Sequence, residues 1–90
     1  MMVEGTFIIQ NKLGLHARAA SQLAQLAMNF DAQITLYQGD KSAQADSVLA
    51  LLLLESGKGK EVRVQCEGPD ADAALAAIGA LIAEKFHEQE

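Results

Sequence analysis

The sequence has one cysteine, one proline and no tryptophan, and it carries few positive charges. Cys66 has no partner for an internal disulfide, so we expect it to be a small buried side chain in a reducing compartment. Lysine and arginine number 7 against 12 acidic residues, which gives a net charge of −5. Nucleic acids and anionic membranes need clustered positive charge, so this balance disfavours both as partners. It leaves room for a docking site for another protein.

Long hydrophobic runs are also missing. The longest, SVLALLLLESG at residues 47–57, has about half the length that a membrane-spanning helix needs, so we expect no membrane insertion. The first ten residues, MMVEGTFIIQ, lack a basic start followed by an apolar core. We therefore expect no signal peptide and a cytoplasmic protein. Half of the 90 residues are apolar, enough for one two-layer core, so residues 1–90 are predicted to form a single domain.

Strand-like and helix-like patterns alternate along the chain. Apolar and polar residues alternate in the predicted strands, which are residues 3–10, 32–37, 42–45 and 61–67. Apolar residues recur at helical spacing in two predicted helices, residues 17–29 and 68–88. Periodicity alone leaves residues 47–56 open between strand and helix, but Ser47 as N-cap favours a short helix. This order predicts an α+β open-faced sandwich, with helices on one side of an antiparallel sheet.

His16 is one of only two histidines, and it stands where the first predicted helix begins. The first turn of a helix has N–H groups without internal partners, which together with the helix dipole favour an anion. Arg18 adds a permanent cation whose guanidinium suits phosphate oxygens. Gly14 lets the preceding loop bend closely. Small side chains keep the helix end unobstructed: Ala17, Ala19 and Ala20.

This setting favours a phosphoryl group carried on the histidine. A helix N-terminus disfavours positive charge, so we expect His16 to rest as a neutral, nucleophilic imidazole. A metal site needs several ligands, and the other histidine, His87, is in the C-terminal tail. No acid between Glu4 and Asp31 is available to orient the ring, so a Ser-His-Asp hydrolase is not supported. We expect no carboxylate beside His16, because it would repel a phosphoryl group. A surface or capping histidine without chemistry is the other interpretation.

The stretch GLHARAA at residues 14–20, followed by an amphipathic helix, resembles the active-site motif of HPr, the histidine phosphocarrier family of the bacterial phosphotransferase system. The resemblance covers the whole chain. NKLGLHAR, FDAQITL and SVLALLLLESGKGKEV also look like the nitrogen-related branch, called NPr. The resemblance implies a βαββαβα fold, with three helices over one side of a four-stranded antiparallel sheet. It leaves the branch, sugar uptake or the nitrogen-related relay, open.

The resemblance also implies a relay. His16 would accept a phosphoryl group on Nδ1 from Enzyme I, which takes it from phosphoenolpyruvate. It would then pass the group to a histidine of an enzyme IIA-type domain, with Arg18 and Ala17 stabilising the phosphate. The family's transfer step requires no metal or cofactor, and we expect a monomer that acts as a carrier and not as a stand-alone catalyst. Many members have proline at the position of Ala19, so we expect a small change in the rigidity of the helix start.

Ser47 and the leucines after it form a second region of interest. Ser47 is expected to cap the short helix, and the resemblance implies a regulatory role, because in some bacteria an HPr kinase/phosphorylase modifies the matching serine. The helix has more leucines than one buried face needs, which predicts an apolar docking patch beside His16. The predicted docking residues are Leu15, Ala20, Leu49, Leu52 and Leu53. The residues of a predicted positive rim, or of plain solubilising charge, are Lys12, Arg18, Lys58 and Lys60.

Two other functions stay open at this point. The first is a regulatory interaction module of the same fold, which acts through the Ser47 surface and transfers no phosphate. The second is an unrelated domain that binds a small ligand. Such a domain needs a concave apolar pocket, and 90 residues with a filled core leave little room for one.

Overall fold

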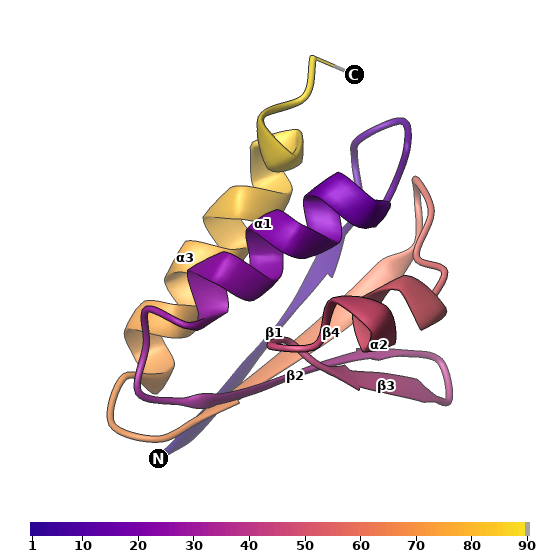
Figure 1. Cartoon of the computed structure of the whole chain (residues 1–90). Helices are drawn as coiled ribbons and strands as arrows, with labels where there is room; N and C mark the ends of the chain where they lie inside the picture. The colour runs from indigo at the N-terminus through magenta and orange to yellow at the C-terminus, as the bar shows by residue number, and fades with distance from the viewer. Residues whose placement is uncertain (90) are drawn as a thin grey trace.

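The computed structural model describes residues 1–89, which form the predicted alternation of strands and helices (Figure 1). The strands are β1 (Met2–Ile8), β2 (Gln33–Gln38), β3 (Lys41–Gln44) and β4 (Glu61–Glu67). The helices are α1 (Ala17–Ala27), α2 (Val48–Leu53) and α3 (Ala71–Ala83), followed by the 3₁₀ turn η1 (Lys85–His87). The βαββαβα order and the β2–β3 hairpin confirm the prediction.

The four strands form one antiparallel sheet in the order β1-β4-β2-β3. In its register, Cys66 of β4 lies opposite both Val3 of β1 and Ile34 of β2, so these side chains share one face. That face packs into the core, whereas the other face carries exposed and half-buried side chains. All three helices contribute to the same core, so they cover one face and leave the other open. The α+β open-faced sandwich is therefore confirmed.

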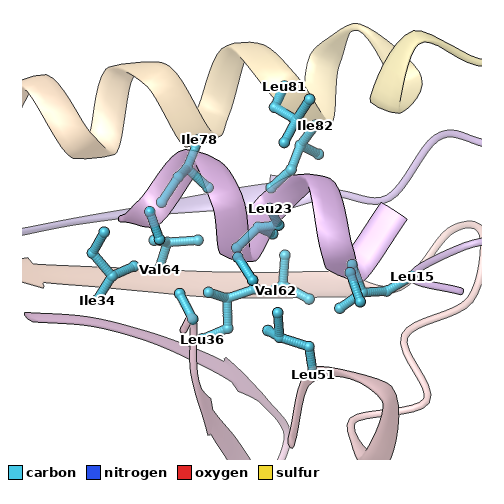
Figure 2. Packing of buried hydrophobic residues seen from close by; sticks show 14 of the residues in the cluster. Leu15, Leu23, Ile34, Leu36, Leu51, Val62, Val64, Ile78, Leu81 and Ile82 are labelled. Atoms are coloured by element: carbon cyan, nitrogen blue, oxygen red, sulfur yellow. The ribbon is translucent and has the colours of Figure 1, made fainter. Parts of the chain in front are cut away.

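The core lies between the sheet and the two long helices (Figure 2). Its central side chains are almost completely buried: Leu23 of α1, Val62 and Val64 of β4, and Ile78 and Ile82 of α3. Helix α3 comes very close to β1 at Gly79, where an added Cβ would lie 2.6 Å from the ring of Phe7. Any larger residue would require the Phe7 ring to shift, so glycine allows this close approach of α3 to β1.

The predicted closing helix over residues 68–88 is too long at both ends. Pro69 precedes α3, which begins at Ala71 and ends at Ala83. The φ angles of Lys85, Phe86 and His87 are 58°, 54° and 63°, a left-handed backbone that L residues rarely adopt. In this reversed segment Phe86 is completely buried, so its side chain packs into the core beyond the end of α3. Glu88, which follows this turn, then lies beside His16 at the start of α1.

Candidate functional site

His16 is the N-cap residue of α1, as the sequence predicts. Its carbonyl accepts the first helical hydrogen bond, from the N–H of Ala20 at 2.8 Å, and its side chain makes no capping bond. The N–H groups of Ala17, Arg18 and Ala19 therefore have no partner within the helix. The side chain of His16 is 27% exposed, so a partner can reach it.

The loop before α1 is held by Asn11, a fully buried polar residue. Its Nδ2 donates to the carbonyl of Gly14 at 2.8 Å, and the N–H of Leu15 donates to the carbonyl of Ser56 at 2.9 Å. Gly14 has a φ of 66°, and an added Cβ would lie 2.6 Å from the Ser56 carbonyl oxygen. Only glycine fits there without strain, so the close packing of this loop fixes where His16 begins the helix.

A carboxylate lies beside His16, so the expectation that none does is wrong. Oε2 of Glu88 contacts Nε2 of His16, and Oε1 accepts from Nδ2 of Asn11 at 3.0 Å. Glu88 is 72 residues away in sequence, and the turn after α3 brings it back to the helix start. A helix that continued through residue 88, as the sequence predicts, would not bring Glu88 back to His16. The sequence signal was weak: an apolar Phe86 among polar neighbours, and an asparagine in a stretch interpreted only as a turn.

The electrostatics of the site favour an ionised Glu88. The hydrogen bond with His16 is the main cause that holds the pKa of this carboxyl below its ordinary value. Burial opposes the effect, while the hydrogen bond from Asn11 and the electrostatic interactions with His16 and Arg18 lower the pKa further. Residues from both chain regions line one pocket: Lys12, Leu13, His16, Arg18, His87, Glu88 and Gln89.

The predicted cations are exposed, as a rim for a partner requires. Arg18 lies in the same pocket as His16. Lys58 and Lys60 belong to the loop between α2 and β4, which pairs with the end of β1 through the N–H of Ile9 and the carbonyl of Lys60 at 2.9 Å. This loop also packs against Gly14, so its lysines lie at the same end of the molecule as the histidine.

The predicted docking residues separate into two groups. Leu49 and Leu53 of α2 are 69% and 64% exposed, and Leu52 is half-buried. Leu15 and Ala20 are buried at 5% and 0% exposure, so their prediction as docking residues is wrong. The bond from Leu15 to Ser56 turns this leucine into the core, where it lies with Leu51 and Val62 (Figure 2). Ala20 lies on the buried face of α1.

Ser47 caps α2, as predicted. Its Oγ accepts a hydrogen bond from the N–H of Ala50 at 3.2 Å. Asp46 precedes it and is exposed. Cys66 is fully buried in β4, and burial raises the pKa of its thiol, which fits a structural residue and not a nucleophile.

Among residues 1–89, no three histidine, cysteine, aspartate or glutamate side chains are grouped as a metal ion would need. In the same residues, no helix is both long and apolar enough to cross a membrane.

Comparisons with known proteins agree on one family. A family model described as "PTS HPr component phosphorylation site" matches residues 3–84. Phosphocarrier protein NPr of Shewanella violacea is 58% identical over 86 residues, covering 96% of this chain and 94% of that protein. Phosphocarrier protein HPr of Cupriavidus necator is 42% identical over 90 residues, covering 100% of each. The crystal structure of HPr-C-His from Thermoanaerobacter tengcongensis has a TM-score of 0.93 at 36% identity, covering 98% of this chain and 99% of that chain.

Proposed function

Because the chain belongs to the HPr family of phosphocarriers of the phosphotransferase system, we propose that it carries a phosphoryl group on Nδ1 of His16. The group comes from Enzyme I, which takes it from phosphoenolpyruvate, and passes to a histidine of an enzyme IIA-type domain. The protein is then a carrier between two partners, and its task is to hold the phosphoryl group in transferable form.

The hydrogen bonding of the two nitrogens of the His16 ring is the observation that supports this proposal. Nε2 is engaged by Glu88, and among residues 1–89 no hydrogen bond reaches Nδ1. Nδ1 is thus the nitrogen with a lone pair available for attack on phosphorus. The N–H groups at the start of α1, beginning with Ala17, have no acceptor within the helix, so they suit the phosphate oxygens. The exposed guanidinium of Arg18 adds charge-assisted hydrogen bonds.

Docking is proposed to use the exposed leucines of α2 together with the cationic rim. Helices α1 and α2 pack against each other, which brings Leu49 and Leu53 to the side of the molecule where α1 begins. A small apolar patch with surrounding cations fits brief encounters with acidic partners. Leu49→Ala should slow transfer from Enzyme I, whereas Met28→Ala, 75% exposed at the other end of α1, should not.

We also propose that the chain serves the nitrogen-related branch. The relative from Shewanella violacea is named NPr and shares 58% of the aligned residues, against 42% for the HPr of Cupriavidus necator. Purified Enzyme I proteins from the two branches test this directly. Faster phosphorylation by the nitrogen-related enzyme supports the assignment, and faster phosphorylation by the sugar-branch enzyme contradicts it.

Labelling with radioactive phosphoenolpyruvate tests the central step. The chain incubated with Enzyme I should gain a phosphoryl adduct that is labile in acid and stable in base. His16→Ala should gain none. His87→Ala is the matched control, because this histidine lines the same pocket, is exposed and should leave labelling intact. Label on the His16→Ala protein refutes the proposal.

A further inference from the structure

Glu88 reaches His16 because the chain reverses direction after α3. Lys85, Phe86 and His87 all have a left-handed backbone, which is costly for L residues. The turn is held by the complete burial of Phe86 and by a hydrogen bond from the N–H of Glu88 to the carbonyl of Lys85 at 3.0 Å. The position of Glu88 is therefore set by core packing.

Each carboxylate oxygen of Glu88 has its own partner at the site. Oε1 accepts from Nδ2 of Asn11, and Oε2 contacts Nε2 of His16. Asn11 is fully buried and also bonded to the Gly14 carbonyl, so it ties Glu88 to the loop that positions the histidine. An ionised carboxylate only accepts hydrogen bonds, so Nε2 must be the donor. In the neutral imidazole, this leaves the lone pair on Nδ1.

We propose that Glu88 is a positioning residue for phosphoryl transfer, which holds His16 in the Nε2–H tautomer and balances the charge of the phosphorylated ring. This inference rests on the proposed function of His16 as the acceptor. The carboxylate contacts the ring at Nε2, whereas the phosphoryl group is attached at Nδ1, so the two anionic groups lie on different nitrogens of the ring.

In the transfer step, one bond to phosphorus forms as another breaks, and no proton has to move. The lone pair of Nδ1 forms the new bond to phosphorus, while the bond from phosphorus to the donor's leaving atom breaks. The electron pair of that bond goes to the leaving group. The proton stays on Nε2, so the His16 ring gains one positive charge as it becomes phosphorylated. The bond to Glu88 is consequently stronger in the phosphorylated state than in the resting state.

The surroundings of Glu88 support this role. The other charged or titratable groups around the pocket are Lys12, His16, Arg18 and His87. Of the described residues that line it, Glu88 is the sole acid. A single carboxylate, held on one nitrogen of the acceptor ring, is therefore the group that faces the positive charge developed in the reaction.

Glu88→Gln is the test variant, because it keeps the side-chain size and removes the charge. Its amide has one oxygen for two donors, so it cannot satisfy both Asn11 and His16 as Glu88 does. Glu84→Gln is the matched control. Glu84 lies just after α3, is exposed, and pairs with His87 at 3.4 Å but not with His16. Its replacement by glutamine changes the net charge by the same amount as Glu88→Gln.

Nitrogen-15 NMR of the His16 ring reads the tautomer without any phosphoryl transfer. At neutral pH, the wild-type protein and Glu84→Gln should hold the proton on Nε2, and Glu88→Gln should lose that preference. In the presence of phosphorylated Enzyme I, the ratio of phosphorylated to free Glu88→Gln should fall on the order of tenfold relative to Glu84→Gln.

The outcomes separate the two proposals. If the wild-type protein takes up label on His16 but Glu88→Gln matches Glu84→Gln in tautomer and in transfer, the role of Glu88 is refuted alone. Higher phosphorylation of Glu88→Gln also overturns it, because repulsion by the carboxylate would then dominate. Failure of the wild-type protein to take up label refutes the function of His16, while the tautomer measurement still tests what Glu88 does to the ring.

Discussion

Replacing Gly14 with alanine should destabilise the protein and misplace His16. The left-handed backbone at φ 66° costs an L residue about 1–2 kcal/mol. The new Cβ would also lie 2.6 Å from the Ser56 carbonyl oxygen and 2.8 Å from the Gly57 Cα, both backbone atoms that cannot rotate away. Such overpacking costs about 1–3 kcal/mol. The sum is roughly 2–5 kcal/mol, a large share of the roughly 5–15 kcal/mol that stabilises a typical domain.

A substitution at a second glycine measures the cost of the left-handed backbone without the cost of overpacking. Gly39, in the β2–β3 turn, has a φ of 59° but nothing within 4 Å of an added Cβ, so Gly39→Ala should lose only the backbone cost of about 1–2 kcal/mol. Urea unfolding of both variants gives the difference, and labelling by Enzyme I reports on His16. Equal losses of stability, or wild-type labelling of Gly14→Ala, would contradict the view that the Gly14–Ser56 contact positions the histidine.

Three other predictions concern single side chains. Arg18→Ala should slow phosphoryl transfer by about 10- to 100-fold, because charged hydrogen bonds to phosphate are lost, with little change in urea unfolding; a large loss of stability would show a structural role instead. Ser47→Ala should cost about 1 kcal/mol in urea unfolding, whereas Ser47→Asp, which also caps helices, should cost less; equal losses would refute the capping role. The pKa of Glu88 lies below its ordinary 4.5, mainly through its bond with His16, so its contacts stabilise the fold fully above that value and are lost as pH falls through the lowered pKa. The gap in unfolding free energy between wild type and Glu88→Gln should shrink from about pH 7 to about pH 3, and a constant gap would count against the contact.

The parts of the structure that follow a local pattern could be predicted from the sequence. Alternation in β4 and helical spacing in α1 depend on neighbouring residues and on burial, and both elements form as expected. His16 could be placed at a helix start for the same reason, because its neighbours on each side mark the boundary. Ser47 as a cap is likewise a local signal.

The errors concern contacts between distant segments. Periodicity could not show that Phe86 is buried through a left-handed turn, because three such residues in succession have no sequence signature without glycine. The same turn brings Glu88 to His16, so the sequence pattern does not predict Glu88 as a site residue. The prediction that Leu15 lies at the surface is wrong because the pattern does not reveal the hydrogen bond from Leu15 to Ser56, and Leu15 is buried. Each case depends on a partner about 40 or more residues away.

The most direct test of the account is the location of the phosphoryl group in the protein phosphorylated by Enzyme I. Nitrogen-15 and phosphorus-31 NMR identify which ring nitrogen is bonded to phosphorus. We expect coupling between phosphorus and Nδ1 of His16, with the proton retained on Nε2 beside Glu88. Phosphorus bonded to Nε2 of His16, or to His87, would contradict it.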